Sequence, residues 1–85
     1  MANHPSDLSL KALRKTLKEV RLAAGMNQLA LAELLNKPQS YISKYESGER
    51  KLDYLEVRNI CYYCNISIET FEQKLIKNLP HKSNI

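Results

Sequence analysis

The chain has 85 residues, of which 44% are hydrophobic and 26% are charged, and its formal net charge is +4. This length and composition are typical of one small folded domain, which excludes a disordered tail and an array of several domains. The positive charge suits a polyanionic partner such as nucleic acid. No apolar run approaches the roughly 18 residues that a membrane span needs. The N-terminus also lacks the pattern of a secretory signal, so we expect no membrane partner and a cytoplasmic location.

The first predicted helix follows a polar segment, residues 1–7, which we expect to be a flexible N-terminal tail. Apolar residues then recur at helical spacing, at Leu10, Leu13, Leu17, Val20 and Ala24. Gly25 can take the left-handed conformation in which many helices end, so we expect the helix to end there. Its lysines and arginines are interpreted mainly as a solvated face.

A second and a third short helix are predicted between Asn27 and Ser47. Asn27 offers a side-chain cap for a helix over 28–35. Asn36 follows, and asparagine is the residue other than glycine that best tolerates the left-handed conformation. The fixed φ of Pro38 suits the start of the next helix, which we expect over 39–47.

Two further helices complete an all-α chain. Asp53 can cap a fourth helix that ends near Cys64, and Ser67 can cap a fifth helix that ends near Leu79. The inward positions of the fourth helix are expected to be Tyr54, Val57, Ile60, Cys61 and Cys64. We therefore expect one compact five-helix domain over residues 8–79, followed by a C-terminal tail over 80–85.

Cys61 and Cys64 form a C-x-x-C pair that has two chemical interpretations. A redox pair needs a strand-turn-helix context, and a zinc site needs two further ligands. Neither is indicated, because His4 and His81 lie near opposite ends of the chain. We interpret the cysteines as buried structural thiols, and we expect no metal, no cofactor and no enzymatic activity.

Residues 28–46 have the spacing of a helix-turn-helix. This motif joins two short helices at a steep angle and restricts particular positions. Ala32 is small where the helices cross, Asn36 accepts positive φ in the turn, and Ile42 is a branched apolar anchor. Together these positions make a fairly specific signal for the motif.

Two stretches carry a resemblance to a known family: Arg-Leu-Ala-Ala-Gly-Met-Asn-Gln at 21–28 and Pro-Gln-Ser-Tyr-Ile-Ser-Lys-Tyr-Glu-Ser-Gly-Glu-Arg at 38–50. Over roughly residues 10–75 the chain resembles the xenobiotic-response-element (XRE) family, which includes the phage Cro and repressor DNA-binding domains. The resemblance implies a compact five-helix, lambda-repressor-like fold and sequence-specific DNA binding, commonly as homodimers on palindromic operators. The chain departs from the family at Asn36, where glycine is usual, and at Lys37, where an apolar residue is usual.

The second helix of such a motif enters the major groove with its N-terminal residues nearest the bases. With Ile42 and Tyr45 turned inward, the residues expected to read bases are Gln39, Ser40, Ser43 and Lys44. Glutamine can pair bidentately with adenine, and lysine can donate to guanine.

Phosphate contacts are expected around this helix. The start of the 28–35 helix favours an anion, and the resemblance assigns phosphate contacts to Asn27 and Gln28. Further candidates are Lys37, Tyr41, Arg50 and Lys51. The resemblance also implies an ion pair between Arg21 and Glu46, with a structural role.

Apolar residues beyond the needs of a small core indicate a homodimer. The strongest candidates are Leu75, Ile76 and Leu79 on the fifth helix, which would set two recognition helices ~34 Å apart. Leu29 and Leu34 stand where the family usually has polar residues, and they are either singly exposed or in contact with a partner.

The sequence thus predicts a regulator of transcription, a repressor or controller, that binds double-stranded DNA at a palindromic operator. The alternative is a protein-interaction module of the same fold without DNA binding. RNA binding is disfavoured because the recognition face offers few aromatic platforms for stacking. No small-molecule ligand is evident, and a phage-type repressor, a restriction–modification controller and an antitoxin all remain open.

Overall fold

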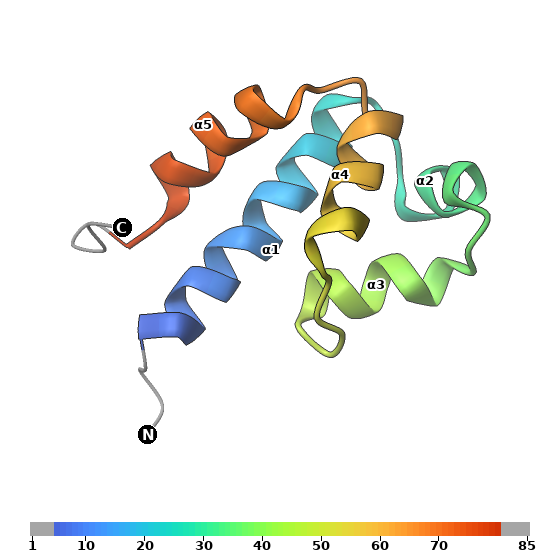
Figure 1. Ribbon diagram of the computed structural model, residues 1–85. Helices are drawn as coiled ribbons and strands as arrows, with labels where there is room; N and C mark the ends of the chain where they lie inside the picture. Colours follow the sequence, from blue (N-terminus) through green and yellow to red (C-terminus); the bar gives the residue numbers. More distant parts are fainter. Residues whose placement is uncertain (1–4, 81–85) are drawn as a thin grey trace.

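The computed structural model describes residues 5–80, and all regular structure within them is helical. The helices are α1 (Pro5–Ala23), α2 (Gln28–Leu35), α3 (Gln39–Ser47), α4 (Tyr54–Tyr63) and α5 (Ile68–Asn78). In Figure 1, α1 runs through the middle of the molecule, with α5 on one side and α2, α3 and α4 on the other. The predicted all-α, five-helix class is therefore confirmed. Residues 1–4 and 81–85, which include His4 and His81, lie outside the described residues.

Helix α1 begins at Pro5 and not after residue 7, so the helix includes part of the predicted N-terminal tail. Proline fits the first turn of a helix because its missing N–H would have no helical partner there. Asp7 lies in the same turn, where its negative charge interacts favourably with the positive end of the helix dipole. Local chemistry at the start of α1 thus extends the helix beyond its apolar stripe.

The predicted side-chain caps are present at the starts of α2, α4 and α5. The side-chain oxygen of Asn27 accepts from the N–H of Ala30 at 2.8 Å, and that of Ser67 accepts from Thr70 at 3.1 Å. Asp53 accepts from the N–H of Glu56, whose carboxylate accepts in return from the Asp53 N–H at 2.9 Å. This reciprocal capping box satisfies two N–H groups that a helix start otherwise leaves free.

The core gathers the inward sides of all five helices. Its fully buried large side chains are Leu17, Leu31, Ile42, Tyr45, Ile60, Thr16 and Cys61. Tyr54 was expected to point inward but is 64% exposed. It is the first residue of α4, and the buried side of that helix begins one turn later, at Val57.

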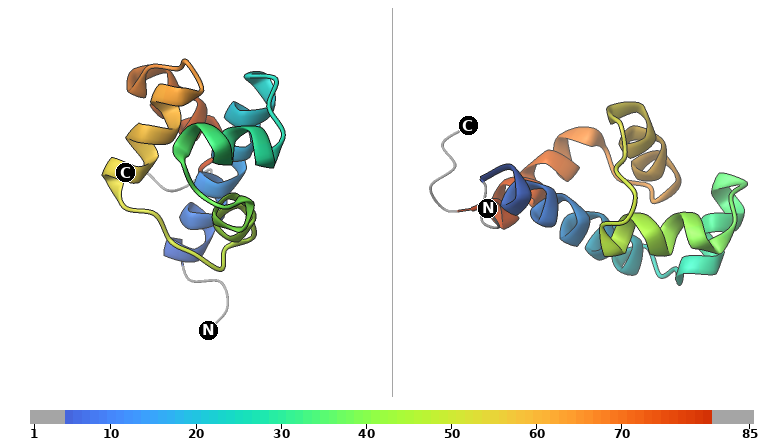
Figure 2. Two further views of the ribbon diagram at one scale, coloured as in Figure 1. Left: turned by 90° about the vertical axis from the view of Figure 1, so that its right-hand side faces the viewer. Right: turned by 90° about the horizontal axis from the view of Figure 1, so that it is seen from below.

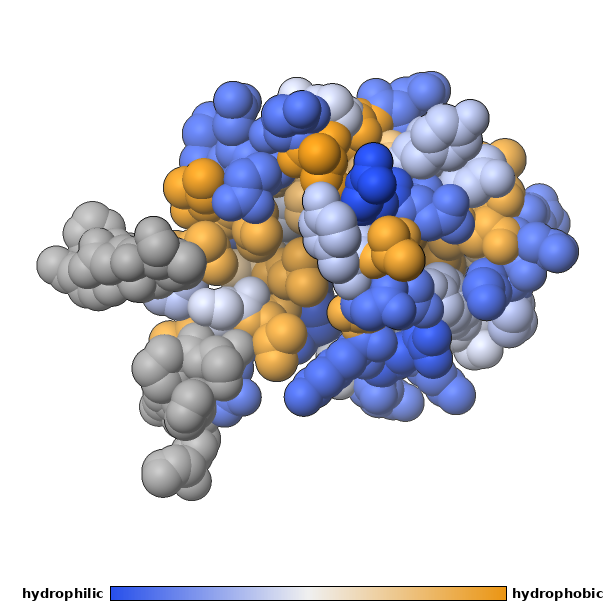
Figure 3. All heavy atoms as spheres, viewed as in Figure 1, coloured by the Kyte–Doolittle hydropathy of each residue, from blue (hydrophilic) through white to orange (hydrophobic). Residues whose placement is uncertain are grey.

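Helix α5 turns back along α1, and the views in Figure 2 agree on this contact. The Asn78 amide near the end of α5 donates to Thr16 Oγ1 and to Glu19 Oε1, both at 2.9 Å. Figure 3 shows apolar residues gathered between α1 and α5, with hydrophilic residues over the lower part of the view, where α3 lies. Within residues 5–80, no helix is both long and apolar enough to cross a bilayer.

Cys61 and Cys64 are buried free thiols on the inner side of the end of α4. Burial raises the pKa of Cys61 to about 11 and also raises that of Cys64. Thiols with raised pKa values are poor nucleophiles at neutral pH, as expected for a structural role. In the described part of the chain, no three potential metal ligands of the His, Cys, Asp or Glu type come together.

Candidate nucleic-acid interface

Helix α3 has one buried and one solvent-facing side. Tyr41, Ile42 and Tyr45 are buried in the core. The four residues expected to read bases lie on the opposite side, where Gln39, Ser40 and Lys44 are exposed and Ser43 is half-buried. The Ser43 hydroxyl donates to the Ser40 carbonyl at 3.3 Å, so it is partly engaged within its own helix. Gln39 and Lys44 are therefore the long side chains of this face that can extend furthest toward a ligand.

The turn before α3 has the geometry of a helix-turn-helix. Asn36 lies in the left-handed region at φ 58° and ψ 45°. The N–H groups of Asn36 and Lys37 donate to the carbonyls of Glu33 and Ala32, at 3.1 and 2.9 Å, and so close the end of α2. Ala32 and Ile42 are both fully buried where α2 and α3 pack together. A small residue, a left-handed turn and a branched anchor thus set the angle of α3.

Arg21 and Glu46 form an ion pair that joins the end of α1 to the end of α3. Arg21 Nε donates to Glu46 Oε2 at 2.7 Å, and Nη2 donates to Oε1 at 3.1 Å. A third nitrogen, Nη1, donates to the Met26 carbonyl at 2.8 Å. Both side chains are only 6% exposed, and the hydrogen bond to Glu46 is the main cause that raises the pKa of Arg21. The bidentate pair therefore fixes the C-terminal half of α3.

The same ion pair is connected to the exposed face of α3 through Gln28. The Gln28 amide donates to Glu46 Oε1 at 3.0 Å, and its own oxygen accepts from Gln39 Nε2 at 3.4 Å. A continuous series of hydrogen bonds therefore runs from Arg21 through Glu46 and Gln28 to Gln39. This arrangement restricts the side chain of Gln39 before any ligand arrives.

Tyr41, a predicted phosphate contact, is buried in the structure. Only 9% of it is exposed, and its hydroxyl donates to Glu56 Oε2 at 3.2 Å. Burial, followed by the nearby Glu56 carboxylate, raises the pKa of Tyr41, so its hydroxyl remains a donor at neutral pH. Position 41 lies next to Ile42 on the inward side of α3, and the start of α4 covers it. We therefore leave Tyr41 out of the proposed contacts.

The remaining phosphate candidates surround α3. Asn27, Lys37, Arg50 and Lys51 are exposed, and Gln28 is half-buried. Lys37 Nζ and Arg50 Cζ both lie over the Tyr41 ring, 5.2 and 4.9 Å from its centroid. Such cation–π contacts orient a cation without neutralising it, so Tyr41 holds Lys37 and Arg50 beside α3, and Arg50 is in addition paired with Glu56 at 2.8 Å.

The dimer candidates on α5 differ in exposure. Leu75 is half-buried and packs against the core, Leu79 is also half-buried, and Ile76 is 56% exposed. Leu29 and Leu34 on α2 are 48% and 49% exposed, which matches the interpretation of exposed apolar side chains. Of the α5 candidates, Ile76 offers the most surface to a partner.

Glu56 is a site residue that sequence reasoning missed. Its carboxylate accepts from the Asp53 N–H, the Tyr41 hydroxyl and Arg50 Nη2, the last at 2.8 Å. The backbone hydrogen bond from Asp53 and then the one from Arg50 lower the pKa of Glu56. The spacing Asp-x-x-Glu before an apolar run is a capping-box signal and predicts part of this role. The contacts with Tyr41 and Arg50 depend on tertiary packing.

Comparisons with known proteins give two findings that agree with this geometry. A family model described as helix-turn-helix matches residues 17–71. A solved structure described as an XRE-family like protein from Pseudomonas syringae pv. tomato str. DC3000 is 36% identical, with a TM-score of 0.77. The match covers 88% of this chain and 92% of that one. No curated protein matched the chain.

Proposed function

Because the chain belongs to the XRE-type helix-turn-helix family, a family of DNA-binding regulators, we propose that it binds a specific site on double-stranded DNA and regulates transcription as a repressor or controller. The observation that carries the proposal is the exposed polar face of α3, on a helix fixed by the Arg21–Glu46 ion pair. A DNA partner also requires the compartment that holds DNA, which we propose to be the cytoplasm.

In the proposed complex, α3 lies in the major groove and its first turn is nearest the bases. Gln39 pairs with adenine through its amide, and Lys44 donates to O6 or N7 of guanine. Ser40 and Ser43 contribute weaker discrimination, because a hydroxyl both donates and accepts. The hydrogen bond from Gln39 to Gln28 supports this assignment, since a side chain oriented in advance loses less conformational entropy on binding.

The phosphate contacts in this proposal come from both ends of the motif. Asn27 and Gln28 lie at the start of α2, where N–H groups and the helix dipole attract an anion. Lys37, Arg50 and Lys51 add positive charge beside α3. Contacts of this kind position the protein and make its affinity salt-dependent, but they do not read sequence.

We further propose that two copies bind a palindromic operator through a dimer that involves α5. Two recognition helices then lie about one turn of DNA apart, ~34 Å. The exposed Ile76, flanked by Leu75 and Leu79, supports this face as the dimer contact.

The test is site selection from random DNA, followed by affinity measurements on the selected site across a range of salt concentrations. Gln39→Ala and Lys44→Ala are each expected to weaken binding by ~1–3 kcal/mol and to relax preference at one base pair. The matched control is Lys15→Ala, an exposed cation on α1 outside the face whose Arg14 and Arg21 contact α3, which should preserve the base preferences. Unchanged affinity and preference in both α3 variants would remove them from the base-reading set.

A protein-interaction module of the same fold is the second candidate function. It is favoured by a groove at the ends of α2 and α4, lined by Leu34, Tyr62, Tyr63, Asn65 and Ile66. Tyr62 is 74% exposed there, so a large aromatic side chain is available to a protein partner. Failure of the selection to enrich any DNA sequence, together with salt-independent weak binding, would favour this alternative.

A further inference from the structure

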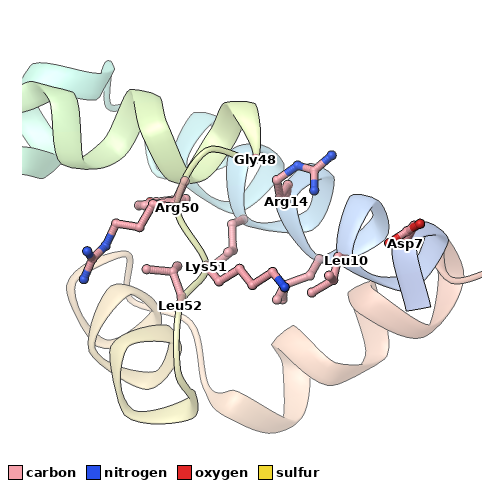
Figure 4. A pocket seen from close by; sticks show the side chains of 10 residues that line it. Asp7, Leu10, Arg14, Gly48, Arg50, Lys51 and Leu52 are labelled. Carbon is pink, nitrogen blue, oxygen red and sulfur yellow. The ribbon is translucent and has the colours of Figure 1, made fainter. Parts of the chain in front are cut away.

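A pocket of about 340 Å³ lies between the first half of α1 and the connection from α3 to α4. This volume is within the range of small-molecule sites. Its apolar lining comes from the leucines at positions 10, 13, 17 and 52. Figure 4 shows Leu10 on α1 facing Leu52 on the connection, with polar side chains around them.

Two positively charged side chains of the lining, Arg14 and Lys51, are free to bind an anion. Arg50 is not one of them, because its Nη2 pairs with Glu56 Oε2 at 2.8 Å and the side chain points away from the pocket in Figure 4. Among residues 5–80, neither Arg14 nor Lys51 has an ion-pair partner. Figure 4 shows the Lys51 side chain extending toward Leu10, across the pocket. With Asp7 the acidic residue of the lining, positive charge is in excess.

Gly48 determines where Arg14 lies. It ends α3 in the left-handed region at φ 93°. A Cβ added to it would come within 3.0 Å of Arg14 Cζ and 3.1 Å of Arg14 Nε. The guanidinium therefore lies close to the Gly48 backbone, and Figure 4 shows the Arg14 side chain near this turn. This contact holds the cation at the edge of the pocket before a ligand binds.

The pocket wall also contains a polar group that the protein leaves unsatisfied. Tyr45 lines the pocket and is only 1% exposed. Its hydroxyl is buried without a hydrogen-bond partner among residues 5–80. Since buried polar groups normally find a partner, this hydroxyl is an unsatisfied group behind the pocket wall, out of reach of a ligand in the pocket.

We propose that this pocket binds a small organic anion, a carboxylate carried on an apolar body. The carboxylate pairs with Arg14 and Lys51, and the apolar body packs on the leucines. A guanidinium suits a carboxylate because its planar donors match both oxygens. A neutral ligand would leave both cations unpaired, and a small hydrophilic anion would leave the leucines in contact with water.

Ligand binding also changes the affinity for DNA, an inference that rests on the function proposed above. Lys51 is one of the proposed phosphate contacts and follows α3 closely in the chain. A carboxylate that pairs with Lys51 holds it in the pocket and removes one positive group from the DNA-facing surface. Occupation of the pocket therefore weakens DNA binding and gives this small domain a means of responding to a ligand.

The binding test uses 1-naphthoate, titrated into the ¹⁵N-labelled full chain at constant ionic strength and followed by NMR. Saturable shifts centred on the amides of Leu10, Gly48 and Lys51 are the expected result. Acetate tests charge alone, and 1-naphthalenemethanol tests the apolar body alone; both should bind far more weakly. Equal shifts with all three compounds, or shifts spread over the whole surface, would overturn the proposal.

Three variants locate the site. Lys51→Gln is expected to weaken naphthoate binding about fivefold, as the loss of one partly exposed ion pair implies. Leu10→Trp fills the pocket and should abolish binding, whereas Lys18→Gln, an exposed cation outside the lining, should not change it. Thermal melts of each variant show whether it is folded. A folded Leu10→Trp protein that binds like the parent would refute the site.

DNA affinity is then measured with saturating naphthoate and with acetate at equal ionic strength. The parent is expected to lose several-fold in affinity with naphthoate only, whereas Leu10→Trp binds the same DNA and does not respond. Naphthoate binding with unchanged DNA affinity would overturn the regulatory part. Naphthoate binding in a protein that binds no DNA would refute the proposed function but leave the ligand site standing.

Discussion

At the scale of single residues, the two ion pairs found within residues 5–80 have very different environments. Arg21 and Glu46 are each 6% exposed, whereas the side chains of Arg50 and Glu56 are 45% and 26% exposed. Loss of one partner from a buried pair leaves an uncompensated charge in a region of low dielectric constant. An exposed pair is replaced by contacts with water and contributes little.

We therefore predict that Arg21→Met destabilises the protein by about 3 kcal/mol, because Glu46 is then buried without its cation. The measurement is the free energy of unfolding in urea at pH 7. Arg50→Met is the matched control and should cost much less. Adding Glu46→Leu to Arg21→Met should recover part of the loss, since no charge remains buried. Equal losses from both arginines would contradict the assigned difference in burial.

The Tyr45 hydroxyl gives a second prediction at this scale. It is buried with no partner within the described residues, and burial is the main cause that raises its pKa. Removal of an unsatisfied buried hydroxyl is neutral or stabilising, so Tyr45→Phe should raise the free energy of unfolding by about 0–2 kcal/mol. Thermal and urea unfolding measure this. A clear destabilisation would mean that the hydroxyl has a partner in solution.

At the scale of the helices, the start of α4 is where local capping and tertiary contacts meet. The Asp53–Glu56 capping box would form in any helix with this sequence. Glu56 also accepts from Tyr41 on α3 and from Arg50 in the connection. One carboxylate thus links the start of α4 to the recognition helix.

This arrangement predicts a dependence of stability on pH. The folded-state pKa of Glu56 lies below its ordinary value of 4.5, mainly because of the backbone hydrogen bond from Asp53. A lowered folded pKa stabilises the protein above the unfolded pKa, and that contribution is lost as the pH falls through the folded value. Glu56→Gln should therefore be less stable than the parent at pH 7, by about 0.5 kcal/mol.

The check is a series of urea titrations from pH 7 to pH 3. The difference between parent and Glu56→Gln should be constant at neutral pH and should shrink below about pH 4.5. The control is the same substitution of a carboxylate outside the capping box, Asp7→Asn in the first turn of α1. A difference that grew as the pH fell would show that the charged form of Glu56 does not stabilise the fold.

At the scale of the whole molecule, one domain carries the α3 side that we propose faces DNA and an exposed apolar residue on α5. On α5, Phe71 is buried in the core and Leu75 is half-buried against it, whereas Ile76 is exposed. Binding of two copies to a palindrome depends on whether this exposed side holds them together. The proposed operator and the proposed dimer are therefore linked.

We predict that Ile76→Glu shifts a dimer to a monomer without unfolding the domain, because the side chain is exposed and its loss leaves no cavity. Sedimentation at tens of micromolar, with and without DNA, measures the change. The control is Leu55→Glu, which alters an exposed leucine on α4 that is not among the dimer candidates. A parent protein that is monomeric in both conditions would contradict the α5 dimer.

Much of the candidate site follows from local sequence. Asn27, Asn36 and Pro38 mark the ends of α2 and the start of α3, because capping and left-handed turns depend on neighbouring residues. The inward position of Ile42 follows from helical periodicity. The resemblance then implied the Arg21–Glu46 pair, which the structure contains.

Residues at the borders of helix faces were less predictable. Tyr54 was expected inward but is exposed, and Tyr41, a candidate phosphate contact beside the outward face, is buried, since a period of 3.6 residues defines the centre of a face but not its edges. Whether an edge residue is covered depends on which other helix packs there. Glu56 covers Tyr41 in this way, whereas no packed helix buries Tyr54.

The sequence by itself therefore determined the five helices, their caps and the turn geometry of the motif, because these depend on interactions within a few residues. Only the tertiary structure decided the hydrogen bonds from Glu46 through Gln28 to Gln39 and the pocket beside Gly48. Both features bring together residues from different segments of the chain. Contacts over such separations arise from the packing of finished helices, and helix packing depends on side-chain shape over the whole core.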